Sequence, residues 1–149
     1  MASYREHALE GAAAVDLVVA LYDGIIRFLY AAITAVECGD ADARRAAVKR
    51  ALDIIIHLQA RLRMDIGGRP AQTLSEFYAA IFAEILQGSQ SASKARFQHA
   101  IDCVRNVRDA WREVARDPGA NSAAPSVLMM PSRPAAEPAD TASSSSWTA

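Results

Sequence analysis

The sequence predicts an all-α protein: an antiparallel four-helix bundle with a short N-terminal helical segment and a disordered C-terminal tail. Apolar residues recur at helical spacing along the first 117 residues, and strand-type alternation is absent. Glycine, proline and capping residues divide this part into four helical stretches. Five of the six prolines lie from Pro118 onward, where large apolar residues become scarce. The chain therefore divides into a bundle domain, 1–117, and a disordered tail, 118–149.

Turn and capping residues separate the four predicted helices. Gly39 favours the end of one helix, and Asp40 caps the next. The third helix begins at Pro70 or at a capping box formed by Thr73 and Glu76. The other boundaries fall at Gly67, Gly68, Gly88, and Ser91 or Ser93. After a short segment at 4–10, the predicted helices span residues 13–38, 41–65, 71–87 and 93–116, and their short loops place neighbouring helices antiparallel.

Charge and hydropathy exclude several classes of protein. The net charge of −1 gives no basic excess, which argues against a nucleic-acid-binding protein. Charged residues such as Asp16 and Asp23 interrupt every apolar run, so we expect no membrane insertion. No basic segment precedes an apolar run at the N-terminus, as a secretory signal would require. We therefore expect a cytoplasmic protein.

The second and third helices carry more apolar surface than a bundle core needs. In the second helix the apolar residues spread over an arc of roughly 200°. The apolar arc of a surface helix usually covers little more than 100°. Two interpretations remain open at this point. The extra surface forms a homodimer interface or is simply less fully buried, or it forms a groove for an amphipathic helix of another protein.

The sequence predicts no enzyme, metal site or cofactor. Asp53 and His57 lie one turn apart, but such a pair is more typical of a solvated surface ion pair than of a catalytic site. The two cysteines, Cys38 and Cys103, lack the spacing of a zinc site. Phosphate-binding loops and nucleophile elbows are also absent from the sequence.

A series of motifs resembles one family. The run from Leu21 to Leu29, LYDGIIRFL, resembles the LYDGAIRFL segment of the flagellar secretion chaperone FliS. Further matches follow in the family's order at Ala51–Ile55, Leu62–Asp65, Leu74 with Phe77 and Tyr78, and Ala110–Trp111. The resemblance covers about residues 4–116. The sequence departs from it at Ala83 and Glu84, where the family usually carries two arginines, and at Ala110, where it carries threonine.

The resemblance implies a cytoplasmic export chaperone without enzymatic activity. Such a chaperone binds the disordered C-terminal segment of flagellin, prevents premature polymerisation and assists delivery to the export gate of the flagellar type III apparatus. We expect one flagellin per chaperone monomer, and a monomer or weak homodimer in solution. The alternative is a structural module, a homodimeric helical bundle that serves another partner.

The predicted partner-binding residues lie mainly on the second and third helices. Ile54, Leu58, Phe82 and Leu86 are predicted contacts because the core stripe does not require them. The resemblance implies that Tyr4 acts as a latch over the binding surface. Tyr22 and Trp111 are expected to be structural, as is Asp23, and Gly24 permits close approach of a neighbouring helix. The remaining predicted contacts are apolar residues of the first and third helices, namely Leu17, Leu21, Phe77, Tyr78 and Ile81. Within the tail, residues Val127 to Met130 form either a short docking element or plain disordered chain.

Overall fold

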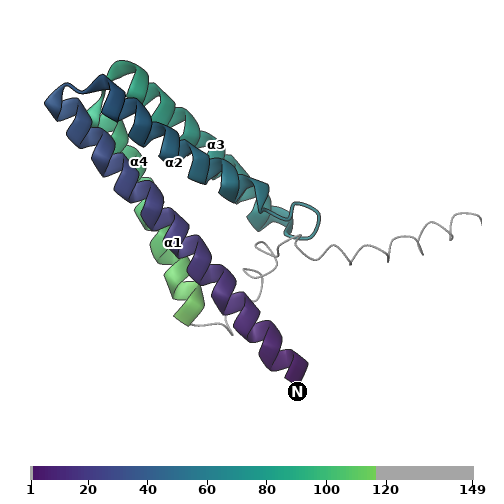
Figure 1. Cartoon of the computed structure of the whole chain (residues 1–149). Helices are drawn as coiled ribbons and strands as arrows, with labels where there is room; N and C mark the ends of the chain where they lie inside the picture. Colours follow the sequence, from purple (N-terminus) through teal and green to yellow (C-terminus); the bar gives the residue numbers. More distant parts are fainter. Residues whose placement is uncertain (1, 117–149) are drawn as a thin grey trace, which may run out of the picture.

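The computed structural model describes residues 2–116, apart from the side chains of residues 2–4 and 7–10. These residues form four α-helices: α1 (Ala2–Cys38), α2 (Ala41–Ala60), α3 (Gly68–Ser91) and α4 (Lys94–Arg116). Consecutive helices run in opposite directions along the bundle (Figure 1). The predicted all-α bundle is confirmed. The predicted division between residues 117 and 118 stays a prediction, because residues 117–149 lie outside the described part.

Each helix packs against its neighbours in a closed ring. α1 packs extensively against α2 and α4, while α3 completes the ring with smaller contacts to α2 and α4. The core lies between all four helices, and its largest fully buried side chains are Tyr22, Phe97, Ile25, Leu29, Ile85, Ile101 and Val104. The α2–α3 interface is thus one of the two less extensive interfaces of the ring.

The N-terminal segment is not a separate element. It was expected at residues 4–10, before a helix starting at residue 13, but α1 is one continuous helix of 37 residues. Gly11 is followed by Ala12, Ala13 and Ala14, and alanine has the highest helix propensity. Neither a proline nor a capping residue interrupts this region, so the helix continues through it. In Figure 1 the N-terminal turns of α1 extend past the end of α4.

The second helix is shorter than predicted. It ends at Ala60 rather than at residue 65, because the backbone N–H of Arg61 bonds the Leu58 carbonyl and closes the last turn. Leu62 is nevertheless only 8% exposed, so it continues the apolar spacing from within a loop. The apolar spacing that predicted five more helical residues therefore reflects Leu62, a core residue in the loop after the helix.

The boundary between the third and fourth helices also differs from the prediction. Gly88 does not end α3. It lies buried within that helix, where a Cβ atom would come 3.1 Å from the ring of Phe97. The helix ends at Ser91, and Ala92 adopts the left-handed conformation with φ of 49°. Ser93 then caps α4, since its hydroxyl accepts a hydrogen bond from the Arg96 backbone N–H at 3.2 Å.

The predicted boundary between the first and second helices is confirmed. Gly39 has a positive φ of 70°, which suits glycine at the end of a helix. The Asp40 carboxylate accepts a hydrogen bond from the Ala43 backbone N–H at 2.9 Å and caps α2.

Candidate functional site

Three successive residues of α1 contact the other three helices. The hydroxyl of Tyr22 lies 2.8 Å from that of Tyr78 on α3, and it accepts a hydrogen bond from Trp111 Nε1 on α4 at 3.3 Å. The two tyrosine rings meet edge to face, with centroids 6.2 Å apart. Tyr22 is completely buried, and Tyr78 is 2% exposed. The expectation that Tyr22 and Trp111 are structural agrees with this packing.

Burial changes the acidity of both tyrosines. It raises the pKa of Tyr22 to about 12, against the hydrogen bonds with Tyr78 and Trp111, which lower it. Burial also raises the pKa of Tyr78, and the neighbouring Tyr22 adds to this effect. Both hydroxyls therefore remain protonated at neutral pH and serve as hydrogen-bonding groups of the core.

The two residues after Tyr22 also contact other helices. Asp23 accepts a hydrogen bond from Arg108 on α4 at 2.8 Å, in an ion pair whose arginine is mostly buried. Gly24 faces α2, where a Cβ atom would come 3.1 Å from Cδ1 of Ile54. The close approach predicted for Gly24 is thus confirmed, and Asp23 makes the structural hydrogen bond expected of it. The YDG sequence serves the assembly of the bundle.

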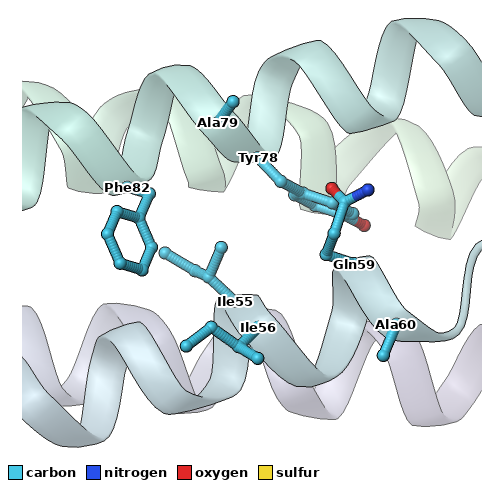
Figure 2. Close-up of a pocket in the computed structure, with 7 residues that line it drawn as sticks. All are labelled: Ile55, Ile56, Gln59, Ala60, Tyr78, Ala79 and Phe82. Carbon is cyan, nitrogen blue, oxygen red and sulfur yellow. The ribbon is translucent and has the colours of Figure 1, made fainter.

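An open apolar pocket lies between α2 and α3 (Figure 2). Its volume is about 450 Å³. None of its lining residues is charged; they are Ile55, Ile56, Gln59, Ala60, Tyr78, Ala79 and Phe82. In Figure 2 the Phe82 ring of α3 and the Ile55 side chain of α2 point toward each other, and the Ile56 side chain lies beside Ile55 on α2. A pocket of this composition suits apolar side chains of a partner.

Ile56 is the most exposed residue of this pocket among the large apolar ones. Its side chain is 54% exposed, whereas Ile55 beside it is 2% exposed and belongs to the core. Gln59 lies on the same helix and donates a hydrogen bond to the Ser75 hydroxyl of α3 at 2.9 Å. The pocket thus combines a fixed floor with an accessible apolar edge, and burying that edge against a partner is energetically favourable.

The structure brings two of the predicted partner-binding residues into the pocket. Phe82 lines it and is partly buried, and Tyr78 contributes to its wall from the core. Leu58 and Ile81 point elsewhere: both are buried, at 2% and 5% exposure, within the core. Leu58 was expected to be dispensable for the core, and its position differs because the core-facing side of α2 runs through Ala51, Ile55 and Leu58.

The other predicted partner-binding residues lie outside the pocket. Leu17 and Leu86 are exposed, at 43% and 41%, while Leu21, Ile54 and Phe77 are partly buried and pack against the core. The side chain of Tyr4 lies outside the described part of the structure, although its backbone belongs to α1. These residues stay predictions as partner contacts.

Sequence reasoning missed Ile56. The signal was present in three consecutive isoleucines, Ile54 to Ile56, because successive helical residues point about 100° apart. Three such side chains cannot all face one core. Ile54 faces α1, Ile55 lies in the core, and Ile56 is left at the pocket edge.

Several ionisable side chains of the described helices form pairs at the surface. Asp53 pairs with Lys49 at 3.1 Å, and His57 accepts a hydrogen bond from Arg61 at 2.7 Å. Glu84, at a position where the sequence departs from the resembled family, pairs with Arg96 and His99 of α4. Within residues 2–116 the His, Cys, Asp and Glu side chains form no cluster of three that suits a metal ion. In that same range no helix is both long and apolar enough to cross a membrane.

Comparison with known proteins identifies the family of this chain. The sequence model of the family described as "Flagellar protein FliS" matches residues 1–118. The chain is 29% identical to a flagellar secretion chaperone FliS of Salmonella typhimurium over 74% of its own length and 82% of that protein. It is 27% identical to the protein of that name from Vibrio cholerae, over 71% of this chain and 78% of the relative. For the Campylobacter jejuni protein of that name, the identity is 32% over 66% of this chain and 77% of the relative. The chain therefore belongs to the FliS family of flagellar secretion chaperones.

Proposed function

We propose that this chaperone binds the disordered C-terminal region of flagellin in the cytoplasm. In this proposal it prevents premature polymerisation of flagellin and assists delivery of flagellin to the flagellar type III export apparatus. Family membership supports the chaperone role. The observation that carries the proposal for this chain is the open, uncharged pocket between α2 and α3. In this proposal it receives apolar side chains of the client.

The physical basis is coupled folding and binding. A disordered segment loses conformational entropy when it becomes ordered on a surface, so it must bury a large apolar area in return. Exposed apolar residues occur on α1, α2 and α3; they include Leu17, Ile56 and Leu86. A client that wraps around the bundle would bury several of them together, which fits an extended chain better than a compact domain.

Binding is tested directly by titrating a peptide of a flagellin C-terminal region into the full chain in a calorimeter. We expect one peptide per chaperone monomer and a negative heat-capacity change, because apolar surface becomes buried. Flagellin polymerisation, followed by light scattering, should slow when equimolar chaperone is present. Absence of binding would contradict the proposal. A permanent dimer that ignores the peptide would favour the homodimeric module instead.

Delivery is tested separately with the isolated cytoplasmic part of the export gate. We expect this component to retain more chaperone when the chaperone carries the flagellin peptide than when it is free. Equal retention with and without the peptide would remove the delivery step from the proposal while leaving client binding intact.

A further inference from the structure

The pocket between α2 and α3 has a candidate occupant within the same chain. Residues 118–149 contain a single run of large apolar residues, Val127, Leu128, Met129 and Met130. We infer that this run, here called the VLMM segment, docks in cis into the α2–α3 pocket and occupies it until flagellin displaces it. The inference rests on the proposed function for its biological role, and on the pocket and the chain's length for its structure.

The chain leaves α4 near the level of the pocket. Trp111 on α4 and pocket-lining Tyr78 on α3 both hydrogen-bond Tyr22, which places the polar ends of their side chains at a similar height in the bundle. Arg116 follows Trp111 by five residues, or about 7.5 Å of helix. Because α3 is the neighbour of both α4 and α2, the route from α4 to the pocket passes one helix.

The linker is long enough for this route. Neighbouring helix axes lie about 8–10 Å apart, so the route around α3 covers roughly 20 Å. Ten residues, 117–126, separate the end of α4 from Val127. Extended chain spans at most about 33–36 Å over ten residues, and a flexible linker of that length averages about 16–19 Å end to end. The pocket therefore lies within the ordinary reach of the linker.

The composition of the segment matches the pocket. Neither the pocket lining nor residues 118–132 include a charged side chain. Pro125 and Pro131 flank the segment and favour extended chain over helix, so alternate side chains would point to the same side. Two side chains of leucine or methionine size fit within about 450 Å³, and methionine adapts readily to irregular apolar surfaces.

Linkage within one chain makes weak docking effective. A short flexible linker gives an effective concentration on the order of 1 mM, so a segment that binds with Kd of about 0.3 mM alone would occupy about three quarters of the pockets. The client must then bind the remaining open fraction, which weakens its apparent affinity about three- to fivefold. The segment would thus protect the apolar pocket and release it to a tighter-binding client.

The test compares the full chain with a variant in which Val127, Leu128, Met129 and Met130 are all replaced by serine. Isoleucine methyl NMR signals report the pocket directly. We expect the Ile56 signal to shift between the two proteins, while that of Ile101, fully buried in the core, stays unchanged. A Trp147→Ser variant, changed elsewhere in the tail, should give the wild-type spectrum.

Three results would overturn the inference. An Ile56 signal that is identical in the wild-type chain and the serine variant would show that the segment does not dock. A shift that grows with protein concentration would assign the pocket to a second copy of the chain. A Trp147→Ser variant that moves the signal as much as the serine variant would show an effect not specific to the VLMM segment.

Measuring the binding of a flagellin peptide to both proteins distinguishes a failure of this inference from a failure of the proposed function. We expect the serine variant to bind the peptide about three- to fivefold more tightly than the wild-type chain. If neither protein binds the peptide but the Ile56 signal still shifts, the proposed function fails and docking in cis stands. If both bind equally and the signal does not shift, only docking in cis fails.

Discussion

Tyr22 of α1 and Tyr78 of α3 place their hydroxyl oxygens 2.8 Å apart inside the bundle, and Tyr78 also forms part of the pocket wall. Tyr22 belongs to the LYDG motif, so this motif supports a wall of the pocket from within the core. Tyr22 shares a hydrogen bond with Tyr78 and accepts one from Trp111. Residues of three helices therefore determine the position of this wall. The motif supports the binding surface without being exposed on it.

Replacing Tyr22 by phenylalanine tests this support. The change leaves Trp111 Nε1 and the Tyr78 hydroxyl without their shared buried partner, and we expect the free energy of unfolding to fall by about 1–3 kcal/mol. Tyr78→Phe should cost less, because Tyr22 keeps the hydrogen bond from Trp111. Urea unfolding followed by circular dichroism measures both. Equal stability of wild type and Tyr22→Phe would contradict the structural role of this network.

The same tyrosines predict a loss of stability at high pH. Unfolded tyrosine ionises near pH 10, whereas the folded-state pKa of Tyr22 is about 12. Between these values the folded state keeps a proton that the unfolded state has lost, so the unfolding free energy falls as pH rises. Tyr22 alone should account for about 1 kcal/mol between pH 8 and pH 11, and Tyr78, whose pKa is also raised, should add to it.

A double Tyr22→Phe, Tyr78→Phe variant is the control for this pH dependence. Tyr30, whose pKa is lowered by its hydrogen bond from Arg105, is present in both proteins and cancels in the comparison. Urea unfolding at pH 8, 9, 10 and 11 should show a steeper decline in the wild type than in the double variant. Parallel declines would show that the buried tyrosines are not responsible.

Two helical glycines should respond differently to alanine. A Cβ atom at Gly24 would meet one terminal methyl of Ile54, which can shift, and alanine gains about 1 kcal/mol in helix propensity. We expect Gly24→Ala to change the unfolding free energy by less than about 1 kcal/mol. At Gly88 a Cβ atom would meet the ring of Phe97, which is completely buried, at 3.1 Å.

We expect Gly88→Ala to destabilise the bundle by about 1–3 kcal/mol, because the buried ring cannot move aside without disturbing the α3–α4 interface. Thermal and urea unfolding of the two alanine variants, measured side by side, give the comparison. The close-packing account of Gly88 is wrong if its alanine variant is as stable as the one at Gly24.

The bundle could be predicted from the sequence because its helix-forming signals are local. Apolar spacing and caps such as Asp40 agree with one another, and the structure confirms the four helices. The predicted helix boundaries were wrong where a residue that resembles a local helix signal is instead required for packing between helices. Gly88 marks a close contact with Phe97 rather than a helix end, and Leu62 is a core residue in a loop.

The pocket could be predicted only in part. The broad apolar arcs identified α2 and α3 correctly as the helices that line it, and Phe82 was among the expected residues. Periodicity does not fix how a helix is rotated within the bundle, so Leu58 was expected outside the core and Ile56 was overlooked. Contacts such as that between Ile54 and Gly24 determine this rotation, and they join residues far apart in the sequence.

The central claim is tested most directly by the affinity of an Ile56→Asp variant for a flagellin C-terminal peptide, with Ile66→Asp as the matched control. The two isoleucines are 54% and 52% exposed, and only Ile56 lines the pocket. Both variants should keep their helical circular dichroism and nearly the wild-type unfolding free energy, as is usual for exposed positions. We predict that Ile56→Asp weakens binding at least about tenfold, the equivalent of about 1.4 kcal/mol, while Ile66→Asp binds like the wild type. Wild-type affinity in the Ile56→Asp variant, or an equal loss in both variants, would contradict the assignment of the α2–α3 pocket as the client site.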